Sequence, residues 1–151
     1  MGTRSITTVT SCWDGQEPEV NATIYRHWDG YINGGHGEWL ADFLADAVVT
    51  NGRQDKPKHF NGPGRLASGI VAALLKYGYD PDLVPAGSVM GQEFEYHIHV
   101  DYGMSGGQVS IRVFDGPMTF FGSGGEDCNN EIFSGTVTEF QSFVQSRKNA
   151  A

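Results

Sequence analysis

Residues 94–102 alternate without a break between apolar and polar side chains, and this pattern limits the fold more than any other feature of the chain. The apolar side chains are those of Phe94, Tyr96, Ile98, Val100 and Tyr102, and the polar ones are those of Glu95, His97, His99 and Asp101. Successive side chains of a strand point to opposite faces of a sheet, so the segment is predicted to be a strand with one apolar and one polar face. The alternation resumes at 109–113 after a turn at 103–107, which predicts a β-hairpin with one wet face.

Further strands are predicted at residues 5–10 and 20–28, where Thr, Val, Ile and Tyr are frequent and a turn at Asp14-Gly15 lies between them. The following segment, 29–37, holds four glycines in nine residues and predicts a tight loop. A short strand is also expected at 118–121.

Two helices are predicted in the middle of the chain. The first spans residues 38–49, where apolar side chains recur along one helical stripe and Asn51-Gly52 supplies a stop. The second spans residues 65–77 and stops at Gly78. A polar loop connects these helices, and a further loop over 80–91 leads to the alternating strand.

A C-terminal helix is predicted from the spacing of Thr136 and Glu139, which fits a capping box with the threonine as N-cap. Phe140, Phe143 and Val144 would form its buried stripe. Together these elements predict an α+β fold, with an antiparallel or mixed sheet and two to three helices packed on one face. We expect residues 1–151 to form a single domain whose other sheet face is left to solvent, a ligand or a partner.

The composition narrows the classes of partner. Ten Lys and Arg against eighteen Asp and Glu give a net charge of −8, and the basic residues are scattered, so general nucleic-acid binding is not expected. The longest apolar run, residues 69–75, is too short to span a membrane. With only two cysteines, Cys12 and Cys128, and no apolar leader at the start, we expect a cytoplasmic protein.

The densest group of functional side chains lies where the second strand gives way to the first helix. It offers aromatic rings for stacking, a guanidinium for a phosphate or carboxylate, and imidazoles. Its candidate ligand-binding residues are Arg26, His27, Trp28, Asp29, Tyr31 and His36. The alternative is structural, with the rings in packing contacts and Asp29 capping a turn.

His97 and His99 are weaker candidates for a metal site, since two histidines on one strand face can share an ion and a nearby carboxylate would add a ligand. A third ligand from elsewhere would be His27 or His36. Exposed polar faces are far commoner than metal sites, so neither a bound metal nor a cofactor is predicted. No catalytic residue is assigned either, because neither cysteine has a motif and no serine lies in a Gly-x-Ser-x-Gly turn.

The motif Tyr-Arg-His-Trp-Asp-Gly-Tyr at 25–31, followed by Gly-His-Gly at 35–37, resembles a family of small uncharacterised phage and prophage proteins. The resemblance continues through matches at 51–52, 60–62, 95–97 and 132–135, and so covers most of the chain. Two differences stand out: Ile32 follows the tyrosine where the family has proline, and the loop is one residue longer.

The resemblance implies a phage-type accessory protein acting in the cytoplasm of the host cell. Our leading hypothesis is a non-enzymatic protein that binds and sequesters a nucleotide-like small molecule to counter host defence. One alternative is a protein-interaction or virion-associated component that contacts a host protein. Another is a metal-dependent enzyme built on His97 and His99. An exposed Phe120-Phe121 pair would mark the interface of a homo-oligomer.

Overall fold

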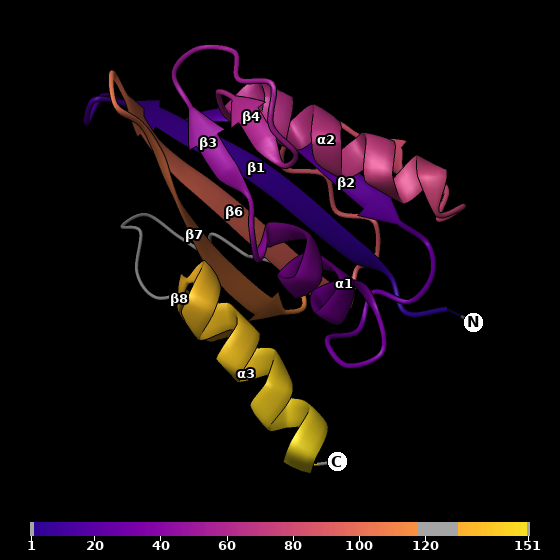
Figure 1. Cartoon of the computed structure of the whole chain (residues 1–151). Coiled ribbons are helices and arrows are strands. Elements are labelled where there is room, and N and C mark those ends of the chain that lie inside the picture. Colours follow the sequence, from indigo (N-terminus) through magenta and orange to yellow (C-terminus); the bar gives the residue numbers. More distant parts are fainter. Residues whose placement is uncertain (1, 118–129, 151) are drawn as a thin grey trace.

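The computed structural model describes residues 2–117 and 130–150 of the chain. In these residues eight strands form one mixed sheet in the order β4-β3-β7-β6-β1-β2-β5, with β8 paired to β7 outside this path. Three helices lie on one side of the sheet, the side that faces the viewer in Figure 1. The predicted α+β class, with helices on one face of a mixed sheet, is confirmed.

The centre of the sheet is formed by β1 (Ser5–Trp13) and β6 (Phe94–Gly103), which are parallel along the whole length of β1. β2 (Glu19–Arg26) pairs antiparallel with β1 on one side, and β7 (Gly106–Asp115) pairs antiparallel with β6 on the other. The predicted hairpin is confirmed, and its turn is tighter than expected because Gly103 pairs with Gly106.

Four short strands complete the sheet: β3 (Val48–Thr50), β4 (His59–Asn61), β5 (Asp82–Leu83) and β8 (Glu131–Thr136). None of them was predicted. The strands β3, β4 and β5 have only two or three residues, which is too short for an alternation to be recognised in a sequence, and β8 shows no regular alternation of apolar and polar residues. The strand expected at 118–121 lies outside the described residues.

The helices are α1 (His36–Leu44), α2 (Pro63–Lys76) and α3 (Val137–Ala150). The prediction that the first helix continues to residue 49 was wrong, because β3 occupies the end of that range. Val48, Val49 and Thr50 are β-branched, which favours a strand over a helix. The Asn51-Gly52 pair therefore follows a strand, and does not stop the helix.

One hydrophobic core lies between the sheet and the three helices. Val9, Tyr96 and Ile98 from the central strands are fully buried in it, with Leu40 of α1 and Phe140 of α3. The even-numbered residues of β6 thus face the helices, as the alternation predicts. The odd-numbered residues face the opposite side of the sheet, which the helices leave uncovered.

The predicted capping box at the start of α3 is present in the structure. The Glu139 backbone N–H donates to the Thr136 hydroxyl at 3.2 Å, and the Thr136 N–H donates to the Glu139 carboxylate at 3.0 Å. Each bond satisfies a backbone donor that has no partner within the helix.

Replacing this cap should weaken the attachment of α3 to the sheet. We expect Thr136→Ala to lower the free energy of unfolding by about 1 kcal/mol, the usual cost of losing a threonine cap. Thr138→Ala, at an exposed position one residue into the helix, should change it by less than about 0.5 kcal/mol. Urea unfolding followed by circular dichroism measures both, and equal losses in the two variants would contradict the assignment.

Candidate functional site

A cavity of about 660 Å³ lies on the face of the sheet that the helices leave uncovered. Its floor is formed by side chains from the four central strands, and residues 86–89 of the loop between β5 and β6 form a wall. The polar and charged floor residues are Thr8, Thr10, Thr23, Glu95, His97, His99, Ser110 and Arg112. A cavity of this volume is large enough for a small-molecule ligand.

The floor contains a hydrogen-bonded pair of side chains on β6, Glu95 and His97. His97 Nε2 lies 2.9 Å from a Glu95 carboxylate oxygen, and the imidazole contacts the Phe114 ring edge to face. The Gln92 amide donates to the same carboxylate at 3.4 Å. Because both members of the pair are largely buried, their orientation is fixed by packing as well as by the hydrogen bond. The cavity thus presents a rigid polar group to a ligand.

Thr23 contributes a hydroxyl that has no hydrogen-bond partner in the described part of the chain. The side chain belongs to β2 and lines the cavity, and its oxygen is buried from solvent. A buried hydroxyl without a partner costs about 1–3 kcal/mol, so such groups in a folded protein call for an explanation. A ligand in this cavity that hydrogen-bonds to Thr23 would supply one.

A second polar group lies further along the same face, where β1 and β6 place Cys12 beside Asp101 and Thr10 beside His99. The Cys12 thiol donates to a carboxylate oxygen of Asp101 at 2.9 Å, and its sulfur lies 3.6 Å from His99 Nε2. His99 Nδ1 lies 2.8 Å from the Thr10 hydroxyl. The four side chains come from two strands far apart in the sequence.

The environment of Cys12 does not favour a nucleophilic role. The hydrogen bond that the thiol donates to Asp101 raises the pKa of Cys12, and burial and the negative charge of Asp101 act in the same direction. Catalytic cysteines need the opposite shift, because the thiolate is the reactive form. The arrangement therefore keeps Cys12 protonated at neutral pH.

The alternation placed His97 and His99 on one polar face of the sheet, and the structure confirms this face. Metal binding by the two histidines stays a prediction. Both imidazoles lie on the uncovered face, as the alternation requires. Among the described residues, the group of three ligand atoms close enough to share an ion is Cys12, His99 and Asp101. It includes neither His97 nor the suggested third ligands, His27 and His36. Cys12 was missed because only the β1–β6 pairing brings it to His99.

The structure divides the six residues predicted as a ligand site into a buried pair and an exposed group. Arg26 and His36 are buried on the helix side of the sheet, where Arg26 Nη1 lies 2.9 Å from His36 Nδ1. His36 Nε2 lies 2.7 Å from the Thr7 hydroxyl. The guanidinium also lies over the ring of Tyr79, 4.3 Å from its centroid. Both ring nitrogens of His36 thus have internal partners, whereas the buried Arg26 Nε has no hydrogen-bond partner among the described residues.

These contacts determine the tautomer of His36. A guanidinium can only donate hydrogen bonds, so Nδ1 must accept from Arg26, and the proton lies on Nε2 and is donated to Thr7. A second proton on Nδ1 would leave two positive groups in contact. Burial, followed by the charge of Arg26, accordingly lowers the pKa of His36 to about 3. The ring is neutral at physiological pH.

The exposed group consists of His27, Trp28, Asp29 and Tyr31. The Trp28 side chain is the most open of these, with 59% of its surface exposed. The Tyr31 hydroxyl donates to Asp29 at 2.8 Å, and His27 lies 3.2 Å from Asp82 of β5. The hydrogen bond to Asp29 raises the pKa of Tyr31. Ligand binding by these residues stays a prediction.

The glycines of the motif lie at close backbone contacts. A Cβ at Gly35 would lie 2.6 Å from the carbonyl oxygens of Asp29 and Tyr31, and one at Gly37 would lie 2.7 Å from the Ile32 Cα. No side chain fits at such distances without displacing the backbone. The motif therefore forms a close-packed corner that joins β2 to α1, and its glycines have a structural role.

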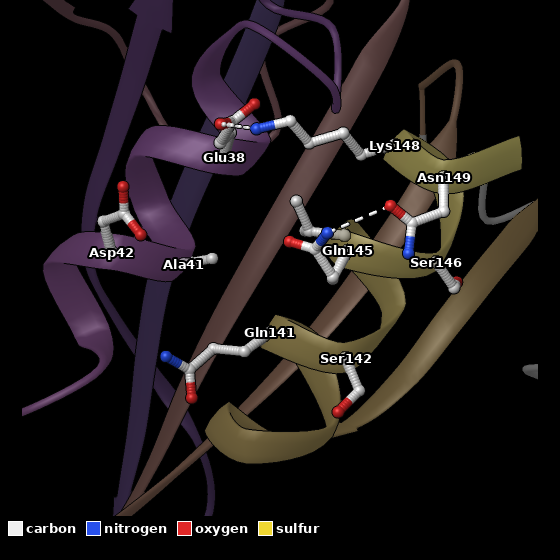
Figure 2. Close-up of a pocket in the computed structure, with 10 residues that line it drawn as sticks. Glu38, Ala41, Asp42, Gln141, Ser142, Gln145, Ser146, Lys148 and Asn149 are labelled. Carbon is white, nitrogen blue, oxygen red and sulfur yellow. Dashed lines mark hydrogen bonds and ion pairs between the residues drawn. The ribbon is translucent and has the colours of Figure 1, made fainter. Parts of the chain in front are cut away.

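A second cavity, of about 630 Å³, lies between α1 and α3 (Figure 2). The Lys148 ammonium bridges the two helices to the Glu38 carboxylate at 3.2 Å. The Gly34 N–H and this ammonium lower the pKa of Glu38. The surrounding amides and hydroxyls, such as those of Gln145 and Asn149, are exposed. Packing restrains these exposed side chains less than the buried polar groups of the uncovered sheet face. We therefore take the uncovered face as the candidate site.

No helix in the described parts of the chain combines the length and the apolar character needed to cross a lipid bilayer. Comparisons with models of protein families, with curated proteins and with solved structures give no match for this chain. The resemblance to phage and prophage proteins therefore stays a prediction, and the function has to be argued from the site.

The neutral, buried His36 makes stability depend on pH. Its pKa is lower in the folded chain than in the unfolded chain, so the unfolded state binds more protons between about pH 6.5 and pH 3. This histidine alone should then reduce the free energy of unfolding by about 1.4 kcal/mol per pH unit as the pH falls through that window. In His36→Gln, where the amide oxygen can still accept from Arg26, the loss between about pH 6.5 and pH 5 should be shallower.

Urea unfolding at several pH values in this window measures the slope for both proteins. The interval lies above the ordinary pKa of carboxylates, so their protonation contributes little there. Equal slopes for wild type and His36→Gln would show that His36 is not held neutral.

Proposed function

We propose that the protein is a non-enzymatic binding protein that holds a small, nucleotide-like molecule in the cavity of the uncovered sheet face. The observation that carries this proposal is the buried Thr23 hydroxyl, which has no hydrogen-bond partner among residues 2–117 and 130–150, in a cavity of about 660 Å³. A ligand would supply a hydrogen bond to this hydroxyl and cover exposed apolar side chains such as Val20 and Val89.

The side chains of the floor indicate what kind of molecule fits. Hydroxyls from Thr8, Thr10 and Ser110 can both donate and accept, which suits the edges of a base or a sugar. Arg112 supplies a guanidinium, although it also pairs with Glu131. The carboxyl group of Glu95 adds hydrogen-bonding oxygens to the same floor. This balance favours a ring-bearing polar ligand with one or two negative charges over a polyanion.

A binding role is supported over a catalytic one by the chemistry of the side chains on this face. Glu95 holds His97 in a hydrogen bond, and Asp101 keeps the Cys12 thiol protonated. A rigid, preorganised set of hydrogen-bonding groups gives affinity without an activated nucleophile.

The resemblance to phage and prophage proteins suggests a biological setting for this activity. In a phage-type accessory protein, tight binding alone is enough to remove a signalling molecule from the host cell. We therefore propose sequestration of a nucleotide-like signal of host defence as the role of the chain. The exposed Trp28 and Tyr31 offer an alternative stacking surface, which the experiment below distinguishes from the cavity.

A thermal-shift screen with cyclic and ADP-ribose-type nucleotides tests the proposal. A ligand at about 100 times its Kd adds about 2.7 kcal/mol to the free energy of unfolding. For a chain of this size the midpoint should then rise by roughly 5–10 °C. Val20→Trp, which fills the cavity from β2, should weaken binding of the responding nucleotide by about tenfold or more.

Val48→Trp is the matched control, because Val48 is exposed to a similar extent on β3 and does not line the cavity. It should retain the wild-type response. A response lost in Trp28→Ala and kept in Val20→Trp would move the site to the motif. No shift with any nucleotide, together with a stoichiometric protein partner recovered from host lysate, would replace the proposal with the protein-interaction alternative.

A further inference from the structure

We infer that Cys12, His99 and Asp101 form a binding site for a divalent metal ion of the zinc type, with one coordination position open. This inference does not depend on nucleotide binding, because it rests on the mutual distances of three ligand atoms, although His99 also lines the cavity. The three residues lie on the uncovered face of β1 and β6, where Cys12 is paired directly with Asp101 across the parallel strands.

Two of the three distances between the ligand atoms fit a tetrahedral ion. Zinc bonds of about 2.3 Å to sulfur and about 2.0–2.2 Å to nitrogen and oxygen imply separations of about 3.3–3.6 Å between ligand atoms. The observed separations are 3.6 Å from Sγ to His99 Nε2 and 3.5 Å from that nitrogen to Asp101 Oδ1. The separation of Sγ and Oδ1 is shorter, 2.9 Å, because the thiol donates a hydrogen bond along it.

Asp101 is free to accommodate the ion. Its side chain is 69% exposed, so a small rotation can widen the separation from the sulfur without disturbing the core. Cys12 is buried and His99 is partly buried, and these two hold the site in place from the sheet side. The exposed side of the group leaves the fourth position to water or to a ligand.

Thr10 orients the imidazole of His99 through the ring nitrogen that faces away from Cys12 and Asp101. Its hydroxyl lies 2.8 Å from His99 Nδ1 and can accept the proton of that nitrogen. Nε2 then carries the lone pair, on the side of the ring where Cys12 and Asp101 lie. Metal-binding histidines characteristically donate their second ring N–H to a neighbouring acceptor in this way.

The chemistry of the ligands selects the type of ion. One thiolate, one carboxylate and one neutral imidazole carry two negative charges, which balance a divalent cation. A thiolate and an imidazole favour zinc-type ions over the harder Mg²⁺ and Ca²⁺. On binding, the S–H bond breaks, the sulfur pair forms the bond to the metal, and the proton passes to solvent.

The position of the site relates it to the cavity. His99 and Thr10 also line the 660 Å³ cavity, so the ion would lie at one end of its floor. A ligand with an oxygen or nitrogen donor at that end could take the open coordination position.

Titration of the full chain with Co²⁺, after removal of metals with a chelator, tests the inference. Co²⁺ replaces zinc in such sites and reports a thiolate ligand by charge-transfer absorption in the near ultraviolet. We expect one equivalent of Co²⁺ to produce this band together with intense visible bands of a four-coordinate ion. One equivalent of Zn²⁺ should abolish both.

Variants assign the ligands. Cys12→Ser should lose the charge-transfer band, and His99→Gln and Asp101→Asn should each weaken Co²⁺ binding. Cys128→Ser removes the other cysteine of the sequence and should leave the spectrum unchanged, as should His97→Gln on the same strand face. A substitution at the buried Cys12 could prevent folding, so a second measurement uses the wild-type chain. If Zn²⁺ protects the Cys12 thiol from an alkylating reagent, Cys12 is a ligand.

Thr10→Val tests the positioning role of the hydroxyl. Loss of an outer hydrogen bond of this kind typically lowers metal affinity about 10- to 100-fold. We expect that loss while the charge-transfer band persists at saturating Co²⁺, since Thr10 is not itself a ligand.

The inference is overturned if wild type gives no charge-transfer band, or if the band survives in Cys12→Ser and disappears in Cys128→Ser. Equal alkylation of Cys12 with and without Zn²⁺ would overturn it as well.

Discussion

β1 lies between β2 and β6 and runs parallel to β6 from Ser5 to Trp13, and the register of this pairing decides which side chains meet on each face. On the helix side it places Val9 beside Ile98 in the core. On the other side it places Thr10 beside His99 and Cys12 beside Asp101. A shift by one residue would exchange the two faces, burying polar groups and exposing the core. The core and both proposed sites therefore depend on one pairing.

The motif at residues 25–31 and 35–37 connects β1, β2 and α1 on the helix side of the sheet. His36 at the start of α1 is neutral and accepts from Arg26 at the end of β2, while its other nitrogen donates to Thr7 of β1. A buried guanidinium is costly unless it is hydrogen-bonded, and burial lowers the pKa of Arg26. One histidine thus ties two strands to a helix. The exposed aromatic residues of the motif belong to the same segment but point away from this network.

Much of the architecture follows from local patterns in the sequence. The alternation at 94–102 identified both faces of β6, and the spacing of Thr136 and Glu139 identified the start of α3. The predicted end of the first helix was wrong because the apolar stripe continues into residues 48–50. These three residues are β-branched and form the strand β3. Cys12 was not predicted as a site residue because its neighbours, His99 and Asp101, lie 87 and 89 residues further along the chain. Local periodicity carries no information on such pairings.

We propose that the face of the sheet opposite the helices is the surface that binds the ligand. A crystal structure of the chain with the nucleotide that responds most strongly is the most direct measurement. We expect ligand density on the floor of the cavity, with a polar atom within hydrogen-bond distance of the Thr23 hydroxyl and contacts to His97. Density stacked on Trp28, with the cavity occupied by ordered water alone, would contradict it.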